Sequence, residues 1–186
     1  VVSWAQPLYD QAAVVDPSVQ QLADQLAAGK DPAGKIVAAL HFVQQEIRYL
    51  GMEDGIGSHR PRHAADTLYR RYGDCKDKTA LLMALLKAMG LSPTAALVSL
   101  EQGEALPNQQ PSPYLFDHVI VTLLLDGKRI WLDGTELNQG DNLQTIAVPY
   151  LRYALLLEPG SSSLTPMDGE YRASDVTVRH EIWVQS

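Results

Sequence analysis

Cysteine is almost absent from this 186-residue chain, which has a single thiol, Cys75. One cysteine cannot form an internal disulfide, so the fold must be stabilised by packing and hydrogen bonds. The missing second cysteine of a Cys-x-x-Cys pair argues against a thioredoxin-like redox protein. A lone cysteine is most often a buried structural residue, so a reactive role for Cys75 needs support from its surroundings.

Positive charge and long apolar stretches are also scarce. Lysine and arginine number 15 against 22 acidic residues, giving a net charge of −7. We therefore expect no nucleic-acid partner, and the one basic cluster, residues 59–63, is expected to be solvated surface. We find no signal-peptide pattern and no apolar run long enough to span a membrane. The chain begins without methionine and ends in strand-like sequence, so we expect a domain excised from a longer protein.

Caps and apolar periodicity predict four helices in the first half of the chain. An Asp-Pro pair starts each of the first two, because aspartate caps free N–H groups and proline fits the first turn. Glycine-rich residues 51–62 are predicted to form a loop. The last helix is expected to be amphipathic, with one face in the core. The predicted helices span residues 17–28, 33–47, 64–71 and 75–89.

The second half of the chain has the composition of β-strands. β-Branched and apolar residues alternate or cluster there, and residues 101–113 read as a polar, proline-bearing loop. Helices followed by strands indicate the α+β class, and one domain over residues 1–186 is the economical interpretation. The predicted strands span residues 94–100, 116–125, 130–132, 150–157 and 175–184.

Cys75 occupies the predicted start of a helix. Gly73 and Asp74 precede it as a turn and an N-cap. The positive end of the helix dipole favours a thiolate over a thiol in the first turn. Cys75 is therefore a candidate nucleophile, which needs a nearby base, and that base needs an orienting group.

His118 and Asp133 are the predicted partners of Cys75. Asp126-Gly127 is a strong signal for a two-residue hairpin turn, which pairs Leu125 with Lys128. In that register His118 lies diagonal to Asp133 on one face, within reach of a hydrogen bond. The other histidines sit in less suggestive places: a helix, the 59–63 loop and the last strand.

Three motifs resemble the bacterial transglutaminase-like superfamily. They are Tyr-Gly-Asp-Cys-Lys-Asp-Lys at 72–78, Phe-Asp-His-Val at 116–119 and Trp-Leu-Asp-Gly-Thr at 131–135. Ile47-Arg48-Tyr49 and residues 61–71 also resemble the segment leading to the nucleophile of that superfamily. The similarity covers roughly residues 36–135. It implies a papain-like core, with N-terminal helices packed on a C-terminal antiparallel sheet.

The resemblance implies a function through this Cys-His-Asp order. Cys75 would be the nucleophile, His118 the acid/base and Asp133 its orienting partner, in acyl transfer on an amide or peptide bond. Hydrolysis, as in a cysteine protease or amidase, and transamidation both stay open, and no cofactor is implied. The oxyanion donor is expected to be the Cys75 N–H or an upstream side chain: Tyr49, Trp4 or, more weakly, Gln44.

The resemblance also suggests context. The Gly-Asp-Cys-Lys-Asp-Lys form at 73–78 resembles a bacterial subgroup in which the core usually follows a β-rich N-terminal domain, often in exported or membrane-attached proteins. We therefore expect flanking domains in the same longer chain, a protein or peptide substrate, and a periplasmic or other extracytoplasmic location.

Other functions remain possible from the residues alone. A peptide-binding module that keeps the papain-like shape without turnover is the main alternative. A zinc hydrolase is poorly supported, because no His/Glu motif has ligand spacing. Calcium at Asp74 and Asp77 is harder to exclude, although capping and surface roles suffice for both. Lys76, Asp77 and Lys78 could shape the entrance to the site, but we expect them only to solubilise the helix start.

Overall fold

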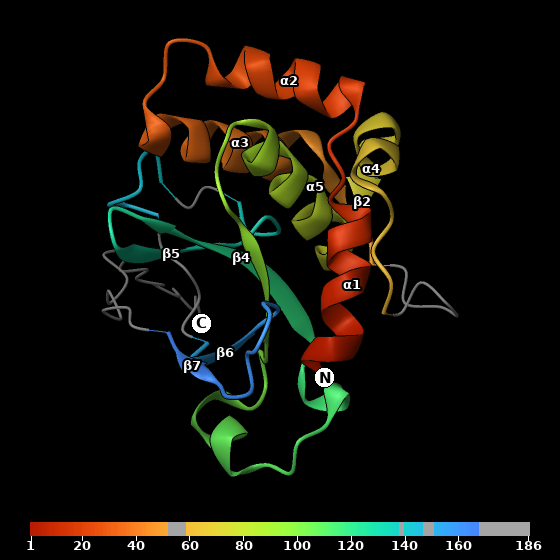
Figure 1. Cartoon of the computed structure of the whole chain (residues 1–186), viewed down its shortest axis with the longest axis vertical. Coiled ribbons are helices and arrows are strands. Elements are labelled where there is room, and N and C mark those ends of the chain that lie inside the picture. The colour runs from red at the N-terminus through yellow and green to blue at the C-terminus, as the bar shows by residue number, and fades with distance from the viewer. Residues whose placement is uncertain (52–58, 138–139, 147–150, 168–186) are drawn as a thin grey trace, which may run out of the picture.

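Helices gather on one side of the molecule and a curled antiparallel sheet on the other (Figure 1). This computed structural model describes residues 1–51, 59–137, 140–146 and 151–167. The predicted α+β class is confirmed. The predicted strand at 175–184 lies outside the described residues, as does position 150 of the predicted strand 150–157.

The predicted helices form within one or two residues of their expected ends. Asp16 and Asp31 cap the first two, accepting hydrogen bonds from Val19 N at 2.9 Å and Gly34 N at 2.8 Å. The helices are α2 (Pro17–Ala27), α3 (Pro32–Glu46), α4 (Ala64–Arg70) and α5 (Cys75–Ala88).

An additional helix, α1 (Val2–Ala12), was not predicted. Pro7 lies within it, and proline argues against a helix interior. The buried residues Ala5, Tyr9 and Ala12 nevertheless follow helical spacing and pack into the core. This helix runs along the side of the molecule where α5 begins (Figure 1).

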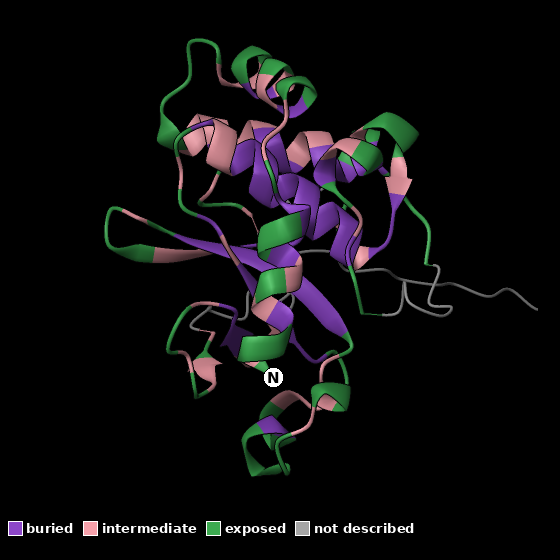
Figure 2. Cartoon of the chain, turned by 45° about the vertical axis from the view of Figure 1, so that its right-hand side comes forward, coloured by how far each residue is buried: buried purple, intermediate pink, exposed green. Residues whose placement is uncertain are grey.

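Helix α5 lies at the centre of the fold. This corrects the expectation that the helix is amphipathic, with only one face in the core. Every residue from Lys76 to Leu86 is buried, and the helix contacts α2, α3, α4 and β4 (Figure 2). A helix enclosed on all sides is a rigid support for the residue at its start. Within the described part of the chain, no helix has the length and apolar character needed to cross a membrane.

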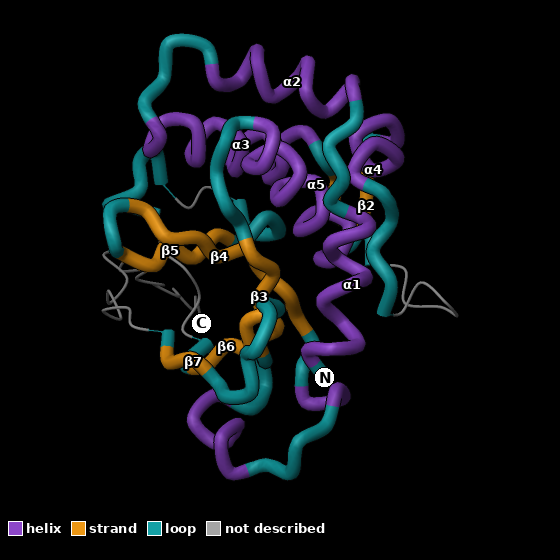
Figure 3. Tube along the Cα trace, viewed as in Figure 1, coloured by secondary structure: helices purple, strands orange, loops and turns teal. Residues whose placement is uncertain are grey.

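The main sheet has the strand order β5-β4-β3-β6-β7 and is antiparallel throughout (Figure 3). Two short strands, β1 (Arg48–Tyr49) and β2 (Tyr72–Gly73), form a separate parallel pair. Two 3-10 turns, η2 (Gly103–Asn108) and η3 (Pro113–Leu115), lie between β3 and β4. The main strands are β3 (Thr94–Val98), β4 (His118–Leu125), β5 (Lys128–Leu132), β6 (Tyr153–Leu156) and β7 (Thr165–Pro166).

The β4–β5 hairpin has the predicted register. Leu125 pairs with Lys128, and the turn residues Asp126 and Gly127 have φ of 51° and 76°. Positive φ at both central positions is the mirror-image turn that suits the twist of a hairpin. This register carries Asp133, the residue after β5, back beside the start of β4.

Alternating strand residues divide the core into two parts. Val119, Val121 and Leu132 pack against the helices, whereas Ile120 and Trp131 belong to a smaller cluster with other sheet residues. Such alternation is the period of two expected of strands. The sheet therefore holds the ends of β4 and β5 firmly beside α5.

Candidate active site

A capping box places Cys75 in the first turn of α5. The Asp74 carboxylate accepts from Lys76 N at 2.9 Å and Asp77 N at 3.2 Å, and the Asp77 carboxylate accepts from Asp74 N at 3.4 Å. The predicted N-cap is confirmed. Gly73 is required here, because a Cβ would lie 2.5 Å from the Asp77 Cβ.

His118 and Asp133 meet across the hairpin. His118 Nε2 lies 2.7 Å from Asp133 Oδ2, so this ring nitrogen donates to the carboxylate. Thr135 fixes the other carboxylate oxygen by donating from its N at 2.8 Å and its Oγ1 at 2.7 Å. Gln44 Nε2 donates to the Asp133 carbonyl at 2.9 Å. Three hydrogen bonds, one from His118 and two from Thr135, thus hold the Asp133 carboxylate, and Gln44 holds its backbone.

The electrostatics of the pair favour an imidazolium. Burial alone would lower the pKa of His118, but hydrogen bonds to Asp133 and Cys75, with their negative charges, raise it to about 10. Burial would raise the pKa of Asp133, but the hydrogen bond and charge of His118 and the bonds from Thr135 lower it overall. Because Nε2 faces Asp133, the opposite nitrogen, Nδ1, is left for Cys75.

A cleft of about 250 Å³ opens beside the Cys75 and His118 side chains. Residues from α1, the segment before α4, the start of α5, β3, the stretch from η3 to β4, and β4 itself line it. These segments are far apart in sequence, so the cleft exists only in the folded chain. Six of its lining residues are Trp4, Tyr9, His59, Cys75, Phe116 and His118.

The structure separates the three expected oxyanion candidates. Trp4 lines the cleft, whereas Tyr49 and Gln44 are not among the residues that line it. Tyr49 pairs with Gly73 through β1 and β2, and Gln44 is buried against Asp133. The strand pairing joins Tyr49 to the segment before Cys75, and the Gln44 hydrogen bond holds the backbone of Asp133.

Tyr9 is a cleft residue that the sequence interpretation missed. It is buried on α1, and burial followed by the charges of Cys75, Asp74 and Asp77 raises its pKa well above the ordinary value. Tyr9 therefore stays a neutral phenol that can donate a hydrogen bond. The helical spacing of Ala5, Tyr9 and Ala12 was the available signal.

The expectation that Lys76, Asp77 and Lys78 only solubilise the helix start is wrong, because all three are buried. Lys76 Nζ pairs with Asp74 at 2.6 Å. Lys78 Nζ donates to the Ile47 carbonyl at 2.6 Å, and burial lowers the pKa of Lys78 to about 8 although the Asp133 charge opposes this. Lys76 thus fixes the Asp74 cap of α5, and Lys78 holds the residue that follows α3.

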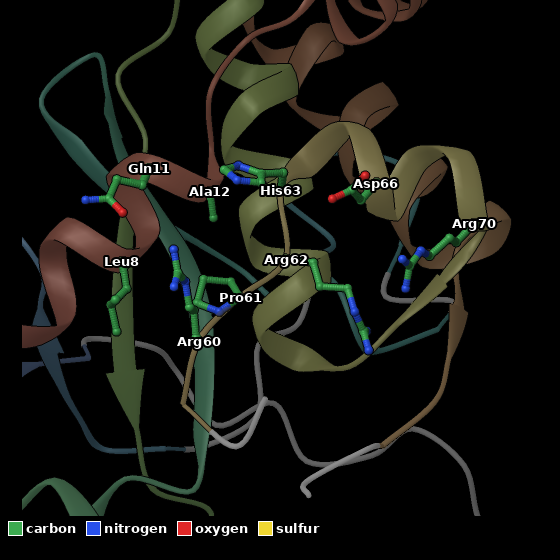
Figure 4. Close-up of a pocket in the computed structure, with 9 residues that line it drawn as sticks. All are labelled: Leu8, Gln11, Ala12, Arg60, Pro61, Arg62, His63, Asp66 and Arg70. Carbon is green, nitrogen blue, oxygen red and sulfur yellow. The ribbon is translucent and has the colours of Figure 1, made fainter. Parts of the chain in front are cut away.

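Asp77 also ties the 59–63 segment to helix α5, so this segment is not simply solvated surface. Arg62 donates from its backbone N at 2.8 Å and from Nη1 at 2.7 Å to the Asp77 carboxylate. Arg62 also borders a second hollow, of about 290 Å³, between α1 and α4 (Figure 4). The Asp77 contacts fix the position of the chain that carries His59 to the cleft.

We predict that Asp77→Asn lowers the free energy of unfolding by about 2 kcal/mol, because a buried carboxylate that accepts charged and backbone hydrogen bonds is lost. Urea unfolding followed by circular dichroism measures this. Asp66→Asn, an exposed carboxylate bordering the same second hollow, is the matched control and should change stability by no more than a few tenths of a kcal/mol. Equal effects of the two variants would contradict the anchoring role.

Metal binding finds no support at the helix start. Among the described residues, no group of three or more histidine, cysteine or acidic side chains is placed to hold an ion. Asp74 and Asp77 already accept hydrogen bonds from Lys76, Arg62 and backbone N–H groups. Hydrogen bonds and ion pairs therefore account for both carboxylates.

Comparison with protein families assigns this chain to a known group. Residues 20–125 match the transglutaminase-like superfamily, more than half of the chain, and the chain belongs to it. The match contains Cys75 and His118 and ends before Asp133. A comparison with curated protein sequences found no match.

Two solved structures share the fold. A candidate protease from Parabacteroides distasonis superposes with a TM-score of 0.65 at 17% identity, over 88% of this chain. A candidate cysteine protease from Cytophaga hutchinsonii superposes with a TM-score of 0.51 at 16% identity, also over 88% of this chain. This chain spans 30% and 57% of the lengths of those two chains.

Proposed function

We propose that this domain is a cysteine acyl-transfer enzyme that cleaves an amide bond in a protein or peptide substrate. The observation that carries the proposal is the His118 ring, which interacts with Cys75 and is held by Asp133 at 2.7 Å. A nucleophile, an acid/base and an orienting carboxylate in this order are the parts that covalent acyl transfer requires. Membership of the superfamily supports the same chemistry.

The first step forms an acyl-enzyme. The Cys75 thiolate attacks the amide carbonyl carbon, forming a C–S bond and a tetrahedral oxyanion. As the oxyanion collapses, the C–N bond breaks and the His118 imidazolium gives its proton to the leaving amine. Asp133 keeps the ring oriented and stabilises its charged form.

The second step releases the acyl group. Water attacks the thioester carbonyl, the neutral His118 accepts a proton from it, and the C–S bond breaks to restore the Cys75 thiolate and release a carboxylic acid. An amine in place of water would give a new amide and therefore transamidation. The same residues serve both outcomes, so the acceptor that reaches the cleft decides between them.

The oxyanion needs donors near Cys75. The Cys75 N–H lies in the first turn of α5, where N–H groups have no acceptor within the helix. The Tyr9 hydroxyl and the Trp4 indole N–H are available from α1, because both side chains line the cleft. The buried Tyr9 is better fixed than Trp4, and we assign it the larger share.

We predict that Tyr9→Phe lowers kcat by about 10- to 100-fold with little change in KM, since an oxyanion donor acts mainly in the transition state. Steady-state hydrolysis of a peptide substrate measures both constants. Tyr72→Phe, which is not among the residues lining the cleft, is the matched control and should leave kcat unchanged. A Tyr9→Phe enzyme with unaltered kcat would remove Tyr9 from the mechanism.

The function is tested by incubating the protein with a mixed peptide library, with and without a labelled primary amine. New amino termini identified by mass spectrometry would establish hydrolysis, and labelled peptides would establish transamidation. Absence of both over a range of peptides and pH values would overturn the proposal and favour the peptide-binding module.

A further inference from the structure

Three aromatic rings from separate segments meet at the mouth of the cleft. The His59 ring lies edge-to-face with Trp4 of α1, with centroids 5.6 Å apart, and with Tyr114 of η3, with centroids 6.3 Å apart. Such T-shaped contacts are favourable ring geometries. Trp4 and His59 line the cleft itself, and Pro113, next to Tyr114, does so as well. We call Trp4, His59 and Tyr114 the aromatic rim.

The aromatic rim leaves large ring surfaces in solvent. Trp4 is 48% exposed and Tyr114 is 84% exposed, whereas Trp131 is buried in the core. Exposing aromatic surface to water is unfavourable, and clustered exposed aromatic residues commonly mark binding surfaces. Two of the three rim residues, Trp4 and His59, line the same cleft as Cys75.

Apolar side chains form part of the lining of the cleft below the rim. Ala5, Leu97 and Phe116 are among its lining residues. Two of its lining residues carry charge outside the proposed catalytic set: Lys76, which pairs with Asp74, and the exposed Asp117, which accepts from Leu100 N at 2.7 Å. Lys76 is thus already paired and Asp117 is itself negative, so an acidic substrate side chain would lose hydration there without gaining a lysine partner.

The size of the cleft limits what can enter. Its volume of about 250 Å³ is below the roughly 300–1,000 Å³ typical of sites that enclose a whole small molecule. The cleft can hold one large side chain together with the reacting amide, with the rest of a peptide outside. Selection should thus operate on a single residue of the substrate.

We propose that the aromatic rim and the apolar residues of the cleft select an aromatic or large aliphatic side chain on the residue that donates the acyl group. This substrate preference rests on the proposed function for its catalytic meaning. Trp4 and Tyr114 are the specificity-determining residues: Trp4 packs against the entering side chain, and Tyr114 covers it from η3. Ring stacking and loss of apolar surface to water supply the selectivity.

Protection of Cys75 against alkylation tests the preference without requiring turnover. N-acetyl amino-acid amides of phenylalanine, leucine, alanine, glutamate and lysine are titrated against the rate of iodoacetamide labelling. Because Cys75 is the one cysteine, labelling reports on this site alone. We expect the phenylalanine amide to protect at a concentration at least about 10-fold lower than the alanine amide, and the glutamate amide to protect least.

Rim variants show whether the rings cause that preference. Trp4→Ala and Tyr114→Ala should each reduce the phenylalanine-over-alanine ratio, toward unity for Trp4→Ala. Tyr69→Ala is the matched control, because Tyr69 is 89% exposed on α4 and is neither a rim nor a cleft-lining residue, and it should keep the full ratio. Two rim variants on different segments keep the test valid if one fails to fold.

The outcomes separate this inference from the proposed function. Equal protection by all amides, stronger protection by a charged amide, or no protection by any of them would overturn the aromatic preference. Selective protection by phenylalanine in a protein that turns over no peptide would retain the binding preference and defeat the catalytic proposal. Peptide turnover with no preference for apolar residues before the cleaved bond would retain the catalytic proposal and defeat the binding preference.

Discussion

Replacement of Cys75 by alanine should reduce peptide turnover to the uncatalysed background, a loss of at least about 10⁴-fold in kcat. The reason is that Cys75 is the one thiol in the chain, so no second nucleophile of this kind can replace it. Time courses of peptide cleavage by wild-type and Cys75→Ala protein at equal concentration measure the loss. Iodoacetamide titration of the wild type, one label per chain, gives the concentration of reactive sites.

The same variant should fold normally. Cys75 is only partly buried and sits at the start of α5, where alanine is compatible with a helix. Circular dichroism and thermal unfolding of Cys75→Ala should therefore match the wild type closely. Residual cleavage above a few per cent of the wild-type rate, in a preparation free of other proteases, would contradict the assignment of Cys75 as nucleophile.

His118→Ala should slow alkylation of Cys75 at mildly acidic pH by about 100-fold. An ordinary thiol with a pKa of about 8.5 is almost wholly protonated two units lower, and only an adjacent imidazolium would keep the sulfur anionic there. Second-order rate constants for iodoacetamide labelling across the pH range measure this effect in both proteins.

The raised pKa of His118 sets the alkaline limit of its charged form. The pKa is about 10 in the folded protein against 6.5 for an ordinary histidine, so the imidazolium persists through the neutral range and is lost as the pH rises through about 10. Because the folded pKa is the higher one, the stabilising contribution of His118 is complete below pH 6.5 and disappears toward alkaline pH.

His63→Ala is the matched control for this experiment. His63 is exposed beside α4 and borders the second hollow instead of the cleft (Figure 4). Its removal should leave the labelling profile unaltered. Equal labelling rates for wild type and His118→Ala at every pH would show that no ion pair forms between Cys75 and His118.

Local sequence signals were sufficient to predict the two elements that bring the candidate residues together. The Asp-Gly turn sets the β4–β5 register, and this register puts Asp133 within hydrogen-bond reach of His118. Asp74 caps α5 as its position before an apolar run predicts. Both signals act through neighbouring residues, so one sequence is enough to detect them. The catalytic roles of the three residues remain predictions.

The errors concern partners that are distant in the chain. Lys78 looks like a surface lysine until its acceptor is seen to be the Ile47 carbonyl, 31 residues away. Asp77 is likewise explained by Arg62, whose loop folds back onto α5. Sequence patterns cannot reveal that a backbone carbonyl or a loop arginine from elsewhere will satisfy a buried charge.

Helix α1 was missed because Pro7 interrupts a short pattern of small apolar residues. The omission hid Tyr9 and left the place of Trp4 undefined, although both line the cleft. Tertiary packing against α5 stabilises this helix despite its proline, and such packing regularly overrides local propensity. A site assembled from segments that are far apart in the chain is thus only partly visible in the motif around Cys75.

Trapping of a covalent intermediate tests the central claim most directly. The protein is mixed with an activated ester, p-nitrophenyl acetate, quenched in acid and measured as intact protein and as peptides by mass spectrometry. The account predicts one acetyl group on Cys75 in the wild type, much slower acetylation of His118→Ala, and none on Cys75→Ala. Acetylation that is unaffected by His118→Ala, or that occurs at other residues while Cys75 stays unmodified, would contradict it.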